Sequence, residues 1–423
     1  MALLILFPIF LLVVLLVTRN NVKIYSTNMR SLWIIVFAIF MIVMSIIHSK
    51  IVNPTVDYFI NIDEANLYNS FLELSRLNYS DIITESFTSF EYLDNSIIYC
   101  MNAMIIKIMA ELGIADGLFS IKTINVFIGS LVPVFIYKCL TIFNAINTQS
   151  KRDLILFACL TPLLSNAIQN TRDVHVCLIF TLMMYLSLKQ RSIKNYVGMG
   201  ILVLVGFFVR AESALFSLVF LGVPVIDSLR KKGTFNKIIL FSLVIAAVLS
   251  FSYLYTFATE TISRYYESGT DDAVSSSLSV KMRALPFPFN YIGVVLFALI
   301  YPFPLWNSFG RSDLIPFMGS IEIVYPFYII PIMLALCIFV GTRYSKLDTK
   351  KMFLFGIAML YIFLNCIGQG MVRRLLAVYP ILILLYIVWC KDNNSILNLC
   401  KKYRKYTFIT LFFLHIVYLF LKS

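Results

Sequence analysis

Long apolar segments alternate with short polar segments along almost the whole chain. A helix needs about 20 mostly apolar residues to cross a bilayer, and many windows approach that length. The first window lacks a basic leader and a small-residue cleavage site, so it is typical of a spanning helix and not of a removable signal peptide. The predicted spanning windows are 2–18, 31–48, 121–142, 154–169, 174–189, 196–211, 213–228, 237–258, 323–341, 352–368, 375–390 and 406–421.

Two further apolar stretches, 95–113 and 291–306, are interrupted by charges or end in a proline-rich segment. We expect them to be juxtamembrane or re-entrant helices on the outer face, because the loops alternate regularly only if neither stretch crosses completely. About twelve crossings then remain. The predicted fold is an all-α polytopic membrane protein with a single integral membrane domain, 1–423. An outer loop with a juxtamembrane helix covers 49–120, and a second outer loop region covers 259–322.

The composition supports a membrane environment. Hydrophobic residues make up 60% of the chain and charged residues 13%, whereas soluble chains have about 45–50% and about 25%. This excludes a soluble enzyme, a disordered protein and a secreted disulfide scaffold. The net charge of +13 is typical of basic cytoplasmic loops, and no basic segment has the pattern that nucleic acid binding requires. The eight cysteines form no C-x-x-C pair and fit a role as apolar filler.

The distribution of charge predicts which side each loop faces. Segment 49–94 carries two basic and eight acidic residues, so we expect it to face out. Basic loops are retained in the cytoplasm, and their alternation with the other loops places both termini outside. The loops predicted to be cytoplasmic are 19–30, 144–153, 189–194, 227–237, 343–351 and 391–405.

On this topology the unusual charges gather at the outer rim, where ionisable groups at membrane depth usually face a cavity or a partner. The guanidinium fork of arginine matches phosphate oxygens, and a nearby carboxylate can act as a general base. Two alternatives stay open: neighbouring charges neutralise each other, or the arginines bind lipid headgroups. The rim residues are Asp63, Glu64, Arg172, Asp173, Arg210, Glu212, Arg373 and Arg374.

Several of these segments resemble motifs of the GT-C superfamily of polytopic glycosyltransferases, which use polyprenyl-linked sugar donors on the outer side of the membrane. Asp63-Glu64 falls where that family carries its catalytic base, in the first outer loop. The segment 92–99 with Lys107 and Gly113 resembles its juxtamembrane helix. The remaining similar segments are 122–129, 208–212 with Arg210, and Arg373-Arg374 followed by Tyr379-Pro380.

The resemblance covers about 50–395 and has clear departures. The Pro-Pro pair before the juxtamembrane helix is missing, an extra helix precedes the catalytic loop, and no large outer C-terminal domain follows. Size, helix number and the abundance of Ile, Phe and Tyr also resemble O-antigen or repeat-unit polymerases. Both resemblances imply transfer from a polyprenyl phosphate or pyrophosphate carrier.

The resemblance implies a glycosyltransferase of the bacterial inner membrane, active on the outer face in O-antigen, lipopolysaccharide or other surface polysaccharide assembly. Asp63 would be the base with Glu64 second, while Arg172, Arg210, Arg373 and Arg374 would bind the substrate phosphate. The expected partners are a polyprenyl-linked glycan donor, a glycan or lipid-linked acceptor and membrane lipids. No cofactor is expected, with a divalent metal left open. The alternatives are a lipid-linked oligosaccharide flippase or other transporter, and a membrane scaffold without chemistry.

Overall fold

The computed structural model describes most of the chain. Every regular element among the described residues is a helix. For 49–51, 62–65, 148, 211–213, 215, 315–323, 364–368 and 421–422 the description covers the backbone alone. The described ranges are 2–20, 22–51, 62–89, 92, 95–114, 116–189, 192–224, 286, 289, 300, 315–343, 347–368 and 375–422.

The helices follow the order of the predicted windows. Their bounds are α1 Ala2–Val17, α2 Lys23–Ile51, α3 Ile62–Ser75, α4 Tyr79–Thr88, α5 Ser96–Glu111, α6 Gly117–Ile142, α7 Thr148–Leu160, α8 Pro162–Ala167, α9 Asp173–Leu188, α10 Ile193–Val209, α11 Ala211–Val219, α17 Ile315–Arg343, α18 Thr349–Gly368, η4 Leu376–Val378, α20 Tyr379–Asp392 and α21 Asn394–Lys422.

Three described helices are long and apolar enough to cross a membrane: Lys23–His48, Gly117–Ile142 and Val324–Arg343. Shorter apolar helices cover Ala2–Val17, Asp173–Leu188 and Ile193–Val209. The chain is thus a helical membrane protein, with fewer spans among its described residues than the about twelve that hydropathy predicts. The predicted window 237–258 lies outside the described residues, as does nearly all of 291–306.

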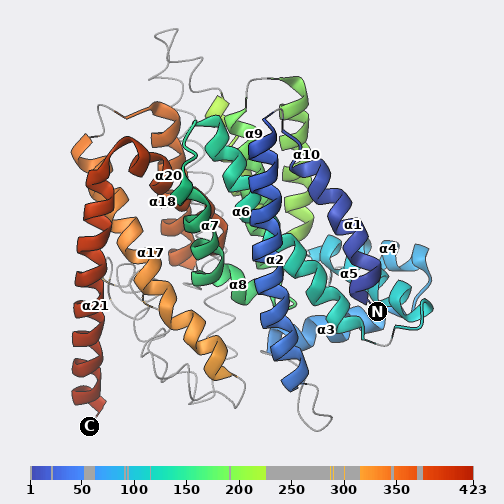
Figure 1. The fold of residues 1–423 in the computed structure, drawn as a ribbon. Helices are drawn as coiled ribbons and strands as arrows, with labels where there is room; N and C mark the ends of the chain where they lie inside the picture. The colour runs from blue at the N-terminus through green and yellow to red at the C-terminus, as the bar shows by residue number, and fades with distance from the viewer. Residues whose placement is uncertain are drawn as a thin grey trace.

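The helices form an upright bundle with α6 at its centre (Figure 1). Helix α6 packs against α2, α5, α7, α8, α9 and α20. Its most apolar window is 83% buried, against 50% for the corresponding windows of α2 and α17. Helix α1 covers α2 and α6 on one side of the bundle, whereas α17, α18, α20 and α21 form the other side.

A glycine allows the close packing at the centre of the bundle. A Cβ placed on Gly129 of α6 would lie 2.8 Å from the Cβ of Ala167 in α8 and 3.2 Å from Val174 in α9. Real side chains do not approach so closely, so the lack of a side chain at this position lets α6 meet α8 and α9. This contact matters for the site, because α9 begins beside it.

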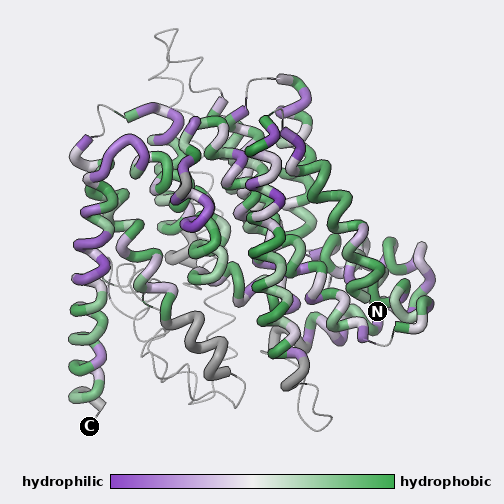
Figure 2. The backbone as a smooth tube through the Cα atoms, viewed as in Figure 1, coloured by the Kyte–Doolittle hydropathy of each residue, from purple (hydrophilic) through white to green (hydrophobic). Residues whose placement is uncertain are grey.

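The bundle has two different ends. Hydrophilic connections between α1 and α2, α6 and α7, α9 and α10, and α20 and α21 gather at the upper end in Figures 1 and 2. Helices α3, α4 and α5 lie at the lower end, where the described chain also starts and finishes. Alternating basic loops predict this arrangement, while the membrane face that each end occupies stays a prediction.

Several predicted boundaries are wrong, as at α2, which already begins at Lys23, and two of the differences have a clear physical reason. The window 154–169 is two helices, because Pro162 has no N–H and its ring clashes with the preceding helical turn. Thr161 is extended there, and its hydroxyl accepts a hydrogen bond from the Leu163 N–H. The predicted loop 391–405 is largely helical, since α21 begins at Asn394 and runs without a break through its basic residues. Lysine and arginine are good helix formers, so charge alone does not end a helix.

The stretch 95–113 forms a helix that differs from the candidate membrane spans. Helix α5 occupies most of it, as predicted, and packs against α3, α4, α6 and α10 at the lower end of the bundle. It is not among the described helices that are apolar and long enough to span. The outer loop predicted at 49–120 therefore contains three helices, α3, α4 and α5.

Candidate functional site

Three helices begin close together at the α3–α5 end of the bundle. Asn95 precedes α5, Arg172 precedes α9, and Arg210 separates α10 from α11. None of these three cap residues makes a side-chain hydrogen bond to the first turn of its own helix. The side chains instead connect the three helix starts to one another. We call Asn95, Arg172, Asp173 and Arg210 the arginine cluster.

A buried ion pair forms the centre of this cluster. Nη1 of Arg210 lies 3.0 Å from Oδ1 of Asp173, and their side chains are only 8% and 7% exposed. Arg210 can reach α9 because its backbone is extended, with φ −170° and ψ 107°, between two helices. Removing one partner of a buried pair leaves an uncompensated charge, which typically costs about 3–5 kcal/mol.

Arg172 connects α9 to α5. Its Nη1 donates a hydrogen bond to Oδ1 of Asn95, and its side chain is only half-buried. The sequence left open that Arg172 pairs with Asp173 and Arg210 with Glu212. The structure instead pairs Arg210 with Asp173 across 37 residues of chain. Two of the four predicted phosphate-binding arginines therefore lie in one cluster, Arg210 through its pair with Asp173 and Arg172 as the residue that precedes Asp173.

The loop between α8 and α9 is held at depth by α6. Nδ2 of Asn125 donates to the carbonyl oxygens of Gln169 at 2.8 Å and Thr171 at 3.4 Å. Asn125 lies eight residues after the start of α6, which corresponds to about 12 Å along the helix axis. The arginine cluster follows Thr171 directly, so α6 also positions it. Buried charged groups in a membrane protein usually mark a functional site.

Two polar side chains beside the cluster have unused hydrogen-bonding atoms. Oδ1 of Asn125 and both ring nitrogens of His175 are buried without a hydrogen-bond partner in the described part of the chain. An unsatisfied buried polar group typically costs about 1–3 kcal/mol. Sequence reasoning missed both residues. The available signal was weak, because each of these largely apolar helices contains several other polar residues.

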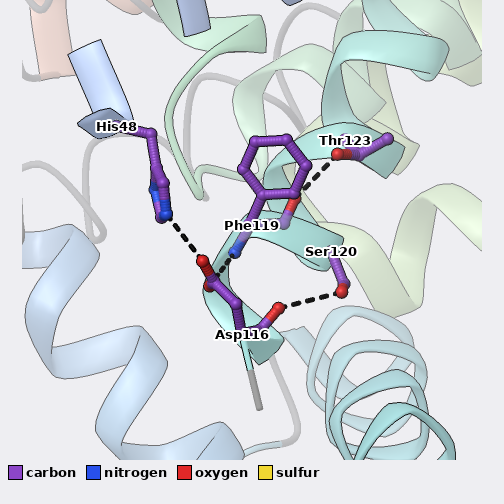
Figure 3. Close-up of polar contacts among 5 residues, drawn as sticks. All are labelled: His48, Asp116, Phe119, Ser120 and Thr123. Carbon is purple, nitrogen blue, oxygen red and sulfur yellow. Dashed lines mark hydrogen bonds and ion pairs between the residues drawn. The ribbon is translucent and has the colours of Figure 1, made fainter. Parts of the chain in front are cut away.

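The start of α6 forms a second polar group (Figure 3). The Asp116 carboxylate accepts a hydrogen bond from the Phe119 N–H at 2.8 Å and lies 2.7 Å from Nε2 of His48. Burial acts to raise the pKa of Asp116, but the contacts with His48 and Phe119 and the charge of Lys122 together hold it below its ordinary value. An Asp cap also suits the positive end of the α6 dipole.

Helix α3 is connected to this group through Tyr68. The Tyr68 hydroxyl lies 3.5 Å from the position that a Gly117 Cβ would occupy. Burial, and secondly the Asp116 carboxylate, raise the pKa of Tyr68, while a backbone hydrogen bond from Leu118 opposes them. The backbone positions of Asp63 and Glu64 lie in the first turn of α3, about one turn before Tyr68. Their side chains lie outside the described part of the structure.

The late arginine motif also lies outside the described residues. The described chain stops at Gly368 and resumes at Leu375, so Arg373 and Arg374 fall in the gap. The segment that follows them, η4, is buried and packs against α9, the helix that begins with Asp173. Among the described residues, no group of three His, Cys, Asp or Glu side chains is arranged to hold a metal ion.

No protein-family model, curated protein or solved structure matches this chain. The resemblance to GT-C glycosyltransferases therefore remains an expectation from short sequence motifs.

Proposed function

We propose that the protein is a membrane glycosyltransferase that transfers a sugar or an oligosaccharide repeat unit from a polyprenyl phosphate or pyrophosphate carrier. One observation carries the proposal: Arg210 pairs with the buried Asp173, and the adjacent Arg172 bonds to Asn95, inside a helical bundle where α5, α9 and α11 begin. About twelve crossings, both termini outside and a site on the outer face of the bacterial inner membrane complete the proposal.

The arginine cluster suits the phosphate of a lipid carrier. Helix N-termini present backbone N–H groups and a partial positive charge, so anions bind well there. Guanidinium groups add paired hydrogen bonds to phosphate oxygens. In this proposal Asp173 orients Arg210, and Arg172 provides the half-buried donor that faces the ligand. Arg373 and Arg374 precede η4 in the chain, and η4 packs against α9. These two arginines would complete the phosphate site.

The chemistry requires a base for the acceptor hydroxyl. Asp63, with Glu64 second, would take the proton as the hydroxyl oxygen attacks the sugar carbon that bears the phosphate. The bond from that carbon to the phosphate oxygen breaks, and the carrier leaves with the electron pair as a phosphate anion. The arginines stabilise this developing charge. The contact of Tyr68 with the start of α6 supports the role of α3, because it holds that helix against the bundle.

This reaction belongs to O-antigen, lipopolysaccharide or other surface polysaccharide assembly. The acceptor would be a glycan or a lipid-linked glycan, and the membrane holds the polyprenyl tail. A polymerase and a single-sugar transferase both fit this chemistry, since each needs the same phosphate leaving group and the same base.

Replacing each candidate carboxylate by its amide tests the proposal. Asp63→Asn keeps the shape of the side chain but cannot accept the proton, so glycan extension should fall about 10²–10⁴-fold. Glu64→Gln tests the second candidate, and Glu73→Gln, at an exposed position of the same helix, is the matched control. Membrane fractions with equal protein levels are assayed for extension of a lipid-linked acceptor. Full extension by both Asp63→Asn and Glu64→Gln would place the base elsewhere. Variants that lose only the transport of the lipid carrier across the membrane would favour a flippase.

A further inference from the structure

We propose that Asn125 and His175 bind the first sugar of the donor, at the hydroxyl or acylamino group beside the phosphate-bearing carbon. The inference rests on the proposed function, because it assigns the neighbouring arginine cluster to the phosphate. It adds a sugar-binding part to that site and a requirement on the substrate.

The free atom of Asn125 is an acceptor. Its side chain faces two backbone carbonyls, those of Gln169 and Thr171, and only the NH2 group of the amide can donate to them. This fixes the orientation of the amide and leaves Oδ1 without a partner. The Asn125 side chain is fully enclosed, at 1% exposed. A group that satisfies Oδ1 must therefore be a hydrogen-bond donor that enters the site.

His175 is near the same backbone segment, four residues after Thr171. The Thr171 carbonyl that accepts from Asn125 also faces the His175 ring. The His175 backbone N–H donates to the Arg172 carbonyl at 3.0 Å, which places His175 one turn after Arg172. Residues three apart share a helix face, so the imidazole belongs to the face on which Arg172 begins. A neutral imidazole offers one donor and one acceptor; the Thr171 backbone faces one ring nitrogen, and the other has no hydrogen-bond partner among the described residues.

Oδ1 of Asn125 cannot bind a second phosphate oxygen, because an ionised phosphate has no hydrogen to donate. A sugar hydroxyl both donates and accepts, and an acylamino group donates through its N–H. In a glycosyl phosphate, the substituent on the carbon next to the phosphate-bearing carbon lies beside the phosphate. Thr171 and Arg172 are adjacent in the chain, so the sugar-binding and phosphate-binding parts of the proposed site are neighbours, as the two groups are in the ligand.

The test measures binding to the purified full-length protein in lipid nanodiscs. Three probes are compared: farnesyl diphosphate, farnesyl diphosphate that carries N-acetylglucosamine, and the same lipid with 2-deoxyglucose. The wild-type protein should bind the N-acetylglucosamine probe about tenfold more tightly than the 2-deoxy probe, because the latter leaves Asn125 and His175 unsatisfied. This comparison needs no substitution and so does not depend on the folding of a variant.

Variants of His175 give an independent measurement. His175→Phe should weaken binding of the N-acetylglucosamine probe about tenfold and leave farnesyl diphosphate unaffected. His175→Gln keeps a donor and an acceptor and should retain most of the affinity. His415→Phe is the matched control, because His415 is also buried but lies in the distant α21.

Each outcome decides between the two proposals. If the wild-type protein binds farnesyl diphosphate but does not distinguish the two sugars, the inference is wrong and the proposed function stands. Equal weakening of all probes by His175→Phe would reduce His175 to a packing role and would also overturn the inference. If no lipid diphosphate binds, both proposals are wrong.

Discussion

Arg172 and Arg210 belong to the same cluster but lie in different surroundings. Arg210 is enclosed and paired with Asp173, so its charge and that of Asp173 depend on each other. Arg172 is half-buried and bound to the neutral Asn95. The first side chain therefore holds α9 against the α10–α11 junction, while the second is better placed to meet a ligand.

Arg172→Lys distinguishes a phosphate clamp from attraction to lipid headgroups. Lysine keeps the charge but loses the planar fork, so we expect glycan extension to fall about tenfold or more, with stability nearly unchanged. Headgroup attraction is worth about 1 kcal/mol for either basic side chain, so it would leave activity intact. Arg152→Lys, at an exposed position of α7, is the control. The same exchange at Arg373 and Arg374 extends the assay, and unchanged activity in all three variants would remove them from the site.

The charge of Asp116 gives a pH-dependent prediction. Its pKa in the folded protein is below the ordinary value of 3.8. The charged form therefore stabilises the fold above about pH 4, and this contribution is lost as the pH falls through the lower pKa of the folded state. Asn also caps helices well, so Asp116→Asn removes the charge and keeps the cap.

Thermal unfolding in detergent should show the wild-type protein to be more stable than Asp116→Asn at about pH 6, with the difference shrinking as the pH falls below about 4. A constant difference across this range would show that the charge of Asp116 does not stabilise the fold.

At the scale of helices, the hydrophobic pattern predicts where a helix lies better than it predicts whether that helix is continuous. The windows 121–142 and 174–189 coincide closely with α6 and α9, because both helices are apolar along their length. The proline indicates the break at Thr161-Pro162, but the apolar residues on both sides make the segment look like one continuous window. The continuous α21 was hidden by its basic segment, since charge marks a side of the membrane and not the end of a helix.

The candidate site was predictable only in part for a related reason. Arg172 and Arg210 are conspicuous in sequence because charged residues are rare in this chain, and the structure brings them together. Asn125 and His175 belong to the same region only because α6 and α9 pack side by side. Their importance depends on unused hydrogen-bonding atoms, and no local pattern reveals which polar residue will lack a partner.

The contact of α6 with α8 and α9 predicts the effect of Gly129→Ala. The added Cβ would lie 2.8 Å from Ala167, so the helices must separate, and we expect a loss of about 1–3 kcal/mol in unfolding free energy. Gly200→Ala on α10 is the control, because nothing lies within 4 Å of its added Cβ and alanine favours helix. Thermal unfolding should show opposite shifts for the two variants. A stable Gly129→Ala protein would mean that the centre of the bundle is loosely packed.

For the whole molecule, the two ends of the bundle differ in their helices and in their connections. The α3–α5 end holds the arginine cluster and the start of α6, and both ends of the described chain lie there (Figure 1). The connections at the opposite end include basic segments, which are typical of cytoplasmic loops. A donor carried on the outer leaflet can reach the cluster only if the α3–α5 end faces out.

Single cysteines test this orientation in a background without native cysteines. Ser80→Cys, exposed on α4, should react with a membrane-impermeant maleimide in spheroplasts, because we place the α3–α5 end outside. Ser192→Cys, exposed between α9 and α10, should react only after the membrane is permeabilised. Permeabilised samples show that both thiols can react, so protection reports sidedness and not burial. Labelling of Ser192→Cys in intact spheroplasts, with Ser80→Cys protected, would place the arginine cluster in the cytoplasm, where the donor would have to be bound before its carrier crosses the membrane.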